Sequence, residues 1–320
     1  SFKRKKMDTT KYMNMVKYGL TAILLKLFSI SPQFYRFLGN QFGAKRRVRH
    51  GIPSDYGKRA KKFLSWYEKY QIIKDGDAVL EIGTGWVHFE SIVIRLFYDV
   101  EATLFDVWDN RQLDALKQYA VQLEELLYQE MDLTQAQKQH IRQLIEIISK
   151  TDSFDSLYKH LNFQYLINAN GTLEPLQDES FQLVYSYNVL EHLDREIAPK
   201  LIQDFYRVLK PGGVSCHDID LTDHLISFVG IHDMPQKYYL RFSDKIWERF
   251  FENKVQYFNR IQCSEWLDFF QQAGLELVEK KITTGDIDTI KVDKTYKHLE
   301  KHDLACERLS IVHRKPLVVG

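Results

Sequence analysis

The apolar positions of the chain follow two different periods, and the change from one to the other marks its predicted elements. Residues 8–38 and 57–70 repeat apolar side chains at helical spacing. The compact apolar run at 78–83 is typical of a buried strand, and the glycines after it end that strand. Helical spacing returns at about 88–98, and a second strand is predicted at 102–107.

The rest of the chain continues this alternation after a long polar stretch. Residues 110–150 have helical spacing and are predicted to form helices inserted in, or extending, the second crossover. An amphipathic helix at 196–210 is followed by the stop signal Pro211-Gly212-Gly213. Further strands are predicted at 163–168, 180–187 and 214–220, within 264–282 after a helix and a glycine stop, and at 309–316 as an edge strand.

Strands that alternate with helices predict one fold class. We expect an α/β, Rossmann-like, doubly wound and mostly parallel seven-stranded sheet, covered by helices on both faces. Residues 1–74 are expected to form a helical N-terminal extension that caps the domain, and 75–320 the domain itself. Within the domain, 110–160 is the helical insertion and 217–262 is expected on the substrate side.

Charge is distributed unevenly along the chain, although its net value is only +1. Residues 1–74 carry 18 Lys and Arg against 3 Asp and Glu, a net charge of +15, so the remainder carries −14. The plain interpretation is a solvated helical surface; the alternatives are contact with an anionic substrate, a membrane surface or a partner enzyme. Nucleic acid ranks last among the partners, because no aromatic-interleaved nucleic-acid module accompanies the charge.

Cysteine usage and hydropathy bear on the cell compartment. Cys216, Cys263 and Cys306 are widely spaced and form neither a metal-ligand pair nor a disulfide framework, which favours a reducing cytoplasm. Residues 19–30 are apolar but number only 12 and include a lysine. A membrane span needs about 20 residues. We therefore expect a cytoplasmic protein whose N-terminal segment packs on the domain or lies on a membrane surface.

A glycine-rich turn follows the first predicted strand, and an acid closes the second. Gly83 and Gly85 allow close approach of the backbone to a ligand, and Asp106 can accept hydrogen bonds from two ribose hydroxyls. The residues after Gly85 do not complete the G-x-G-x-x-G pattern that cradles a pyrophosphate. A nucleoside ligand without phosphates therefore fits this loop better than a dinucleotide.

These segments resemble class I S-adenosylmethionine (SAM)-dependent methyltransferases of the type 11 and 12 kind. The resemblance extends over most of 75–282 and is carried by VLEIGTGW (79–86), ATLFDVW (102–108), ANGTLEPLQDESFQLVYSYNVLEHL (169–193) and YRVLKPGGV (206–214). It implies SAM as cofactor, with Asp106 on the ribose and Asn170 near the adenine, where an Asp is more common. The implied cofactor site comprises Glu81, Gly83, Thr84, Gly85, Trp86, Asp106, Asn170 and Tyr187.

The segment HDIDLTDH (217–224) is a second candidate for chemistry. His217 with Asp220, and His224 with Asp223, can each pair as a general base and its orienting carboxylate. The alternative is a polar loop whose aspartates cap a helix. With RFSDKIWE (241–248) and 257–278, this segment resembles bacterial methyltransferases of polysaccharide and sugar biosynthesis. That resemblance implies that Asn259 and Arg260 face the substrate. His192 is also expected on the substrate side, where it would help to close the cleft.

A metal site is not expected, although Glu191, His192 and His217 are possible ligands. The sequence predicts a SAM-dependent O-methyltransferase that acts on a glycan or another hydroxylated small molecule with a histidine base. A metal-assisted methyltransferase acting on RNA or a quinone-type molecule is the first alternative. The second is a non-catalytic scaffold protein that keeps the SAM fold.

Overall fold

The computed structural model describes residues 2–29, 45–231 and 233–317, with side chains from Tyr12 onward. Its strands form one seven-stranded sheet in the order β3-β2-β1-β4-β5-β7-β6. Their bounds are β1 Ala78–Ile82, β2 Glu101–Asp106, β3 Phe163–Ile167, β4 Phe181–Tyr187, β5 Leu209–Asp220, β6 Glu276–Thr284 and β7 Cys306–Arg314. The first five are parallel, and β7 runs antiparallel to both of its neighbours. The predicted Rossmann-like fold is confirmed.

The last strand was predicted at the sheet edge, and this prediction is wrong. β7 lies between β5 and β6, and its residues 309–313 are buried. The edge position is taken by β6, whose side chains are largely exposed. The glycine pair at 212–213, predicted to stop a helix, instead lies inside β5, which begins at Leu209.

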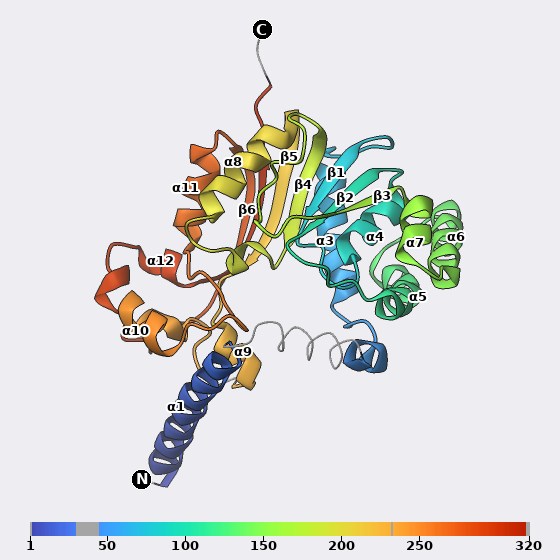
Figure 1. The fold of residues 1–320 in the computed structure, drawn as a ribbon. Coiled ribbons are helices and arrows are strands. Elements are labelled where there is room, and N and C mark those ends of the chain that lie inside the picture. The colour runs from blue at the N-terminus through green and yellow to red at the C-terminus, as the bar shows by residue number, and fades with distance from the viewer. Residues whose placement is uncertain (1, 30–44, 232, 318–320) are drawn as a thin grey trace.

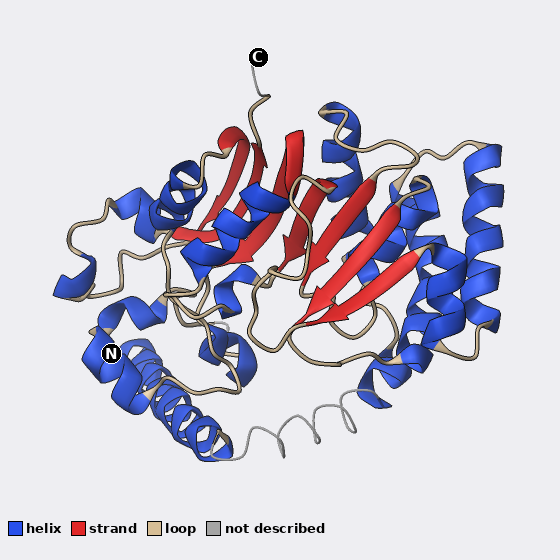
Figure 2. Cartoon of the chain, turned by 45° about the horizontal axis from the view of Figure 1, so that its top comes forward, coloured by secondary structure: helices blue, strands red, loops and turns tan. Residues whose placement is uncertain are grey.

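Helices cover both faces of the sheet, as Figure 2 shows. The first face packs against α3 (Tyr56–Lys69), α4 (Phe89–Phe97), α5 (Leu113–Glu130), α6 (Gln135–Lys150) and α7 (Phe154–Leu161). The second face packs against α8 (Ala198–Val208) and α11 (Cys263–Gln272). Burial of these apolar faces is the main favourable contribution to folding. The cysteines are free and buried.

A third apolar cluster lies below the sheet and holds the first helix. α1 (Phe2–Phe28) packs against α9 (His224–Val229) and α10 (Asp244–Phe250). Residues 30–38, which were also predicted to be helical, lie outside the described residues. The cluster buries Tyr18, Ala22 and Leu25. Figure 1 shows the N-terminal half of α1 projecting away from the domain. The remaining short elements are η1 (Leu190–His192), η2 (Tyr238–Arg241), η3 (Lys294–Tyr296) and α12 (Lys301–Leu304), and residues 45–50 are helical.

Candidate active site

The glycine loop at the carboxyl end of β1 has the backbone that its residues predict. Gly83 and Gly85 have φ angles of 69° and 62°, a region that other residues rarely adopt. A Cβ on Gly83 would lie 2.6 Å from the methyl carbons of Val189. Val189 directly precedes η1, which follows the parallel strand β4. The glycine loop and the turn after β4 are therefore in direct contact.

Asp106 ends β2 beside this loop, where a parallel sheet binds ligands. Its Oδ2 accepts a hydrogen bond from the backbone N–H of Gly85 at 3.1 Å, and its Oδ1 one from the N–H of Val107 at 2.8 Å. Burial raises the pKa of Asp106, and these backbone donors partly offset that rise. The N–H groups of Gly85 and Val107 therefore fix the carboxylate of Asp106 beside the glycine loop.

Two residues predicted to face the cofactor point into the protein instead. Glu81 is 2% exposed, and its Oε2 accepts hydrogen bonds from the hydroxyls of Thr84 and Ser91. Burial, and then the neighbouring Glu90, raises the pKa of Glu81 to about 8. Thr84 is buried as well. Both side chains make hydrogen bonds within the chain and so shape the loop.

The loop is capped by an arginine that sequence reasoning did not single out. The guanidinium of Arg47 lies 3.5 Å from the ring centroid of Trp86, which is half exposed. A cation over an indole face is the strongest of the cation–π contacts. Asn170, predicted near the adenine, lies exposed after β3, and its N–H donates to Asn168 at 3.2 Å.

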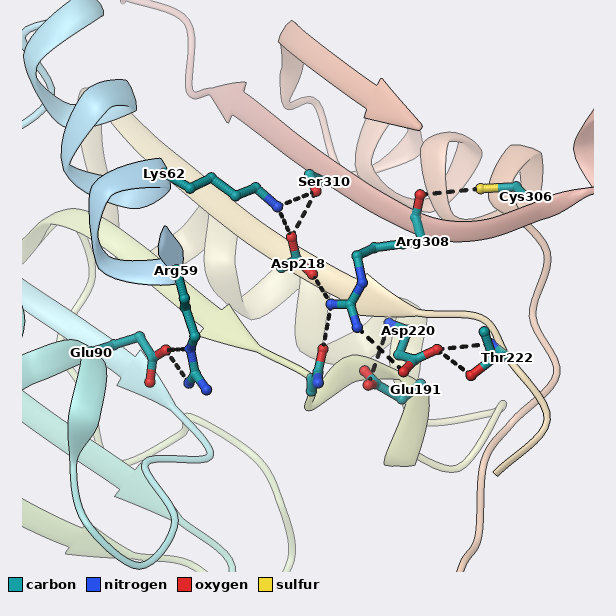
Figure 3. Close-up of polar contacts among 11 residues, drawn as sticks. Arg59, Lys62, Glu90, Glu191, Asp218, Asp220, Thr222, Cys306, Arg308 and Ser310 are labelled. Carbon is teal, nitrogen blue, oxygen red and sulfur yellow. Dashed lines mark hydrogen bonds and ion pairs between the residues drawn. The ribbon is translucent and has the colours of Figure 1, made fainter. Parts of the chain in front are cut away.

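The basic cluster at 58–62 supplies internal counter-ions. Arg59 of α3 pairs with Glu90, and its guanidinium also lies 3.5 Å from the ring centroid of Tyr187. Lys62 pairs with Asp218, which is fully buried on β5 (Figure 3). The sequence KRAKK at 58–62 gathers four basic side chains, but charge alone does not show which of them turn inward.

Asp218 is the centre of this polar network. Arg308 of β7 pairs with Asp218 and also donates to Asn188 at 3.0 Å (Figure 3). Burial by itself would raise the pKa of Asp218, but Lys62 and Arg308 outweigh burial, and the pKa lies below its usual value. The network therefore ties α3, β5 and β7 together through an ionised carboxylate.

The structure contradicts the assignment of His217 as a general base. Its ring is 0% exposed and packs between Phe205 and Phe270 on the second face of the sheet. Both ring nitrogens form hydrogen bonds, Nδ1 with Ser186 at 2.7 Å and Nε2 with Ser215 at 2.6 Å. No nitrogen is left for a substrate, and the predicted pair with Asp220 does not form.

The two aspartates predicted as orienting carboxylates have structural roles instead. Asp220 accepts hydrogen bonds from the N–H and hydroxyl of Thr222, at 2.9 and 2.6 Å. Asp223 caps α9 by accepting from the N–H of Leu225 at 3.0 Å. The helix-capping alternative was therefore correct for Asp223, and its predicted pair with His224 does not form.

His224 does lie at a potential reaction centre, together with His192. The ring centroids are 5.0 Å apart and the rings perpendicular. The Nδ1 of His192 is 2.7 Å from the carbonyl of Tyr257, and that of His224 is 3.0 Å from the carbonyl of Thr222. Because a carbonyl only accepts, Nδ1 carries the hydrogen in each ring and Nε2 keeps its lone pair.

Both histidines are neutral near pH 7. Although part of its side chain reaches solvent, loss of hydration and then repulsion from His224 lower the pKa of His192 to about 4. Loss of hydration also lowers the pKa of His224, while the charge of Asp220 acts against that change. The two imidazoles can therefore accept a proton at neutral pH.

Glu191 completes this group. Its carboxylate is 1% exposed, and within the described residues its Oε2 has no hydrogen-bond partner. Burial raises the pKa of Glu191 well above its usual value. One ligand atom each of Glu191, His192 and His224 lie within 4.8 Å of one another, close enough to hold a divalent ion. The metal candidate of the sequence differed by one residue, with His217 in place of His224.

Asn259 and Arg260, predicted to face the substrate, are occupied by the protein. The amide of Asn259 donates to the carbonyls of Leu190 and Leu193, at 2.8 and 3.1 Å. It therefore fixes the η1 turn that carries Glu191 and His192. Arg260 forms a 2.9 Å ion pair with Asp244 and donates to the hydroxyl of Tyr296.

Residues 80–216 match the family model described as methyltransferase domain. Solved structures that resemble the chain include a candidate sarcosine dimethylglycine methyltransferase from Galdieria sulphuraria, with 13% identity, a TM-score of 0.47, and coverage of 81% of this chain and 86% of the other. Phosphoethanolamine N-methyltransferase 2 from Haemonchus contortus, in complex with SAM, is 14% identical, with a TM-score of 0.45. The match covers 80% of this chain and 52% of the other. A SAM-dependent methyltransferase from Mesorhizobium loti is 12% identical, with a TM-score of 0.39 and coverage of 75% and 91%. No curated protein matches the sequence.

Proposed function

We propose an acceptor site and a base on the premise that the chain is a class I SAM-dependent methyltransferase, given its fold and its methyltransferase domain at 80–216. The proposed reaction is O-methylation of a hydroxylated small molecule. The observation that carries it is the pair of neutral histidines, His192 and His224, with bare Nε2 atoms beside the turn that contacts the glycine loop.

Bound SAM supplies an electrophilic methyl group on its sulfonium. Gly83, Gly85 and Asp106 are the residues proposed to hold it, since they lie at the carboxyl ends of β1 and β2. The remaining task of the chain is to align a hydroxyl with the methyl carbon and to remove its proton.

His224 is the proposed general base. Within the described residues no hydrogen bond to its Nε2 is found, its Nδ1 is fixed by the Thr222 carbonyl, and the charge of Asp220 favours the protonated ring that forms during transfer. His192 is the proposed orienting group, because it is the more exposed of the two and the Tyr257 carbonyl fixes its Nδ1. We propose a glycan as the acceptor on the basis of the resemblance to methyltransferases of sugar biosynthesis.

Methyl transfer from labelled SAM to hydroxylated sugars, nucleotide sugars and lipid-linked glycans tests this function. We expect His224→Ala to lower kcat by about 10²–10⁴-fold and His192→Ala to act mainly on KM. His160→Ala is the matched control, because His160 is exposed on α7 and its Nδ1 also bonds a backbone carbonyl. SAM binding without turnover on any acceptor would favour the scaffold alternative. Full turnover in His224→Ala would exclude the histidine base.

Metal-assisted transfer is a second candidate, favoured by the unpartnered Oε2 of Glu191 beside the two histidines. These groups would hold a divalent cation, and the cation would in turn bind the acceptor hydroxyl. Chelator treatment distinguishes the candidates: activity that falls and returns with Mg²⁺, Mn²⁺ or Zn²⁺ supports the metal, and unchanged activity supports the histidine base alone. Glu191→Gln should lower the affinity for added metal in calorimetry if the site binds it.

A further inference from the structure

The first helix is apolar on two opposite faces, but only one of them is packed. Tyr18, Ala22 and Leu25 are at most 3% exposed against α9 and α10. The opposite face presents Met13, Val16, Leu20, Ile23, Leu24 and Leu27 to solvent, each between 43% and 58% exposed. These six positions recur at spacings of three and four residues, so they form one continuous stripe along the helix. We call them the outer stripe.

The same helix is strongly basic. α1 contains seven Lys and Arg and one acid, Asp8. Lys3, Arg4, Lys5 and Lys6 lie in its first two turns, and Lys17 is exposed near the outer stripe. Among the described residues no helix is long and apolar enough to cross a membrane. An apolar stripe combined with cationic side chains is the composition of a helix that lies in a membrane interface.

The position of α1 also fits such a contact. Figure 1 shows it projecting from the domain, and the 45–50 helix lies on the same side of the molecule in Figures 1 and 2. Lys45, Arg46 and Arg49 of that helix are exposed. Two basic elements therefore lie on one side of the molecule. Arg59 and Lys62 of α3, in contrast, form ion pairs inside the protein.

We infer that the outer stripe of α1 docks the protein on an anionic membrane surface. The apolar side chains enter the interface between head groups and acyl chains, and the lysines and arginines contact lipid phosphates and acidic head groups. Charge complementarity selects this occupant over a second copy of the chain, because α1 carries seven Lys and Arg against one acid and two copies of it would repel each other. The inference goes beyond methyl transfer and does not depend on it.

Sedimentation with lipid vesicles tests the inference without any activity measurement. We expect the full chain to bind phosphatidylcholine vesicles containing 30% phosphatidylglycerol, at least tenfold more tightly than pure phosphatidylcholine vesicles, with release in 0.5 M NaCl. Leu20→Gln with Leu24→Gln should weaken this binding by at least tenfold. Val121→Gln with Ile147→Gln is the matched control, since both residues are exposed on α5 and α6.

Two outcomes would overturn the inference. One is equal binding of the Leu20/Leu24 variant and the unmodified chain, or no binding by either. The other is a dimer in light scattering without lipid that becomes a monomer in the Leu20/Leu24 variant, because the stripe would then be covered by a second copy. Circular dichroism and unchanged SAM affinity establish that the variants are folded.

Discussion

The hydroxyl of Tyr18 in α1 donates a 2.7 Å hydrogen bond to Oδ2 of Asp223, 205 positions further along the chain. Asp223 caps α9 and directly precedes His224, the proposed base. This buried hydrogen bond thus joins the projecting helix to the residue that precedes the proposed base. Removal of this hydrogen bond should therefore affect both the packing of α1 and the segment that carries His224.

Replacement of Tyr18 by Phe keeps the ring in its aromatic cluster but leaves Oδ2 of Asp223 without this donor. We expect the free energy of unfolding to fall by about 1.5–3 kcal/mol, the range for hydrogen bonds to charged groups. Urea unfolding at pH 8, where Asp223 is ionised, measures the loss. Tyr12→Phe, at a position 69% exposed, should change nothing. A loss of equal size in both variants would contradict the role of the hydrogen bond.

The carboxyl of Asp223 should make stability depend on pH. Burial raises its pKa to about 7, whereas in the unfolded chain the value is about 3.9. Between these values the folded state holds a proton that the unfolded state has released, so this residue's contribution to stability is lost as pH rises from about 4 to 7. Asp223→Asn removes this titration, so the unfolding free energy of the variant should fall less between pH 5 and pH 8 than that of the unmodified chain. An identical pH profile for both proteins would mean that Asp223 does not titrate in this window.

Gly83→Ala should disturb the cofactor loop for two separable reasons. One is the positive φ, and the other is the contact of a new Cβ with Val189. Gly76 has a φ of 87° and open space around it, so Gly76→Ala isolates the backbone cost, about 1–2 kcal/mol. We expect a larger loss in Gly83→Ala, and partial recovery when Val189→Ala is added. Thermal unfolding measures the loss of stability, and SAM titration measures the loss of cofactor affinity. Equal losses of stability in Gly76→Ala and Gly83→Ala would show that the Val189 side chain moves aside at little cost.

Asp106→Ala should weaken SAM binding by roughly 1.5–3 kcal/mol, the range for lost hydrogen bonds to a charged acceptor. That corresponds to about 10–150-fold in Kd, measured by calorimetry. Asp109→Ala is the comparison, because Asp109 is half exposed and pairs with Arg111. Unchanged affinity in Asp106→Ala would mean that the ribose lies elsewhere.

The sequence predicted the sheet because its strands are local patterns. Compact apolar runs placed β1 to β4 within one residue of their observed bounds. The glycine loop and Asp106 were likewise local, since turn glycines and a strand-ending acid follow directly from the chain. The position of β7 in the sheet does not follow from its local sequence. It depends on which strand pairs with β5, and nothing within 309–316 encodes that choice.

The direction in which a side chain points was the harder problem. His217 and Asp218 are adjacent on β5, so they face opposite sides of the sheet. One packs between phenylalanines and the other binds Lys62 and Arg308. The HDIDLTDH segment concentrates titratable groups in the sequence, but the strand distributes them in space. Only His224, beyond the end of the strand, reached the proposed acceptor site.

The interior position of His217 bears on the tolerance of the fold to acid. His313 also packs against the Phe270 ring, and burial lowers the pKa of His313 to about 4 and that of His217 well below its usual value. Unfolded histidines take up protons near pH 6.5, whereas these two do not while the core is closed. Acidification below that point therefore favours the open chain at two places in one aromatic stack. Proton uptake by these two rings on unfolding should therefore contribute to the loss of stability of the fold in acid.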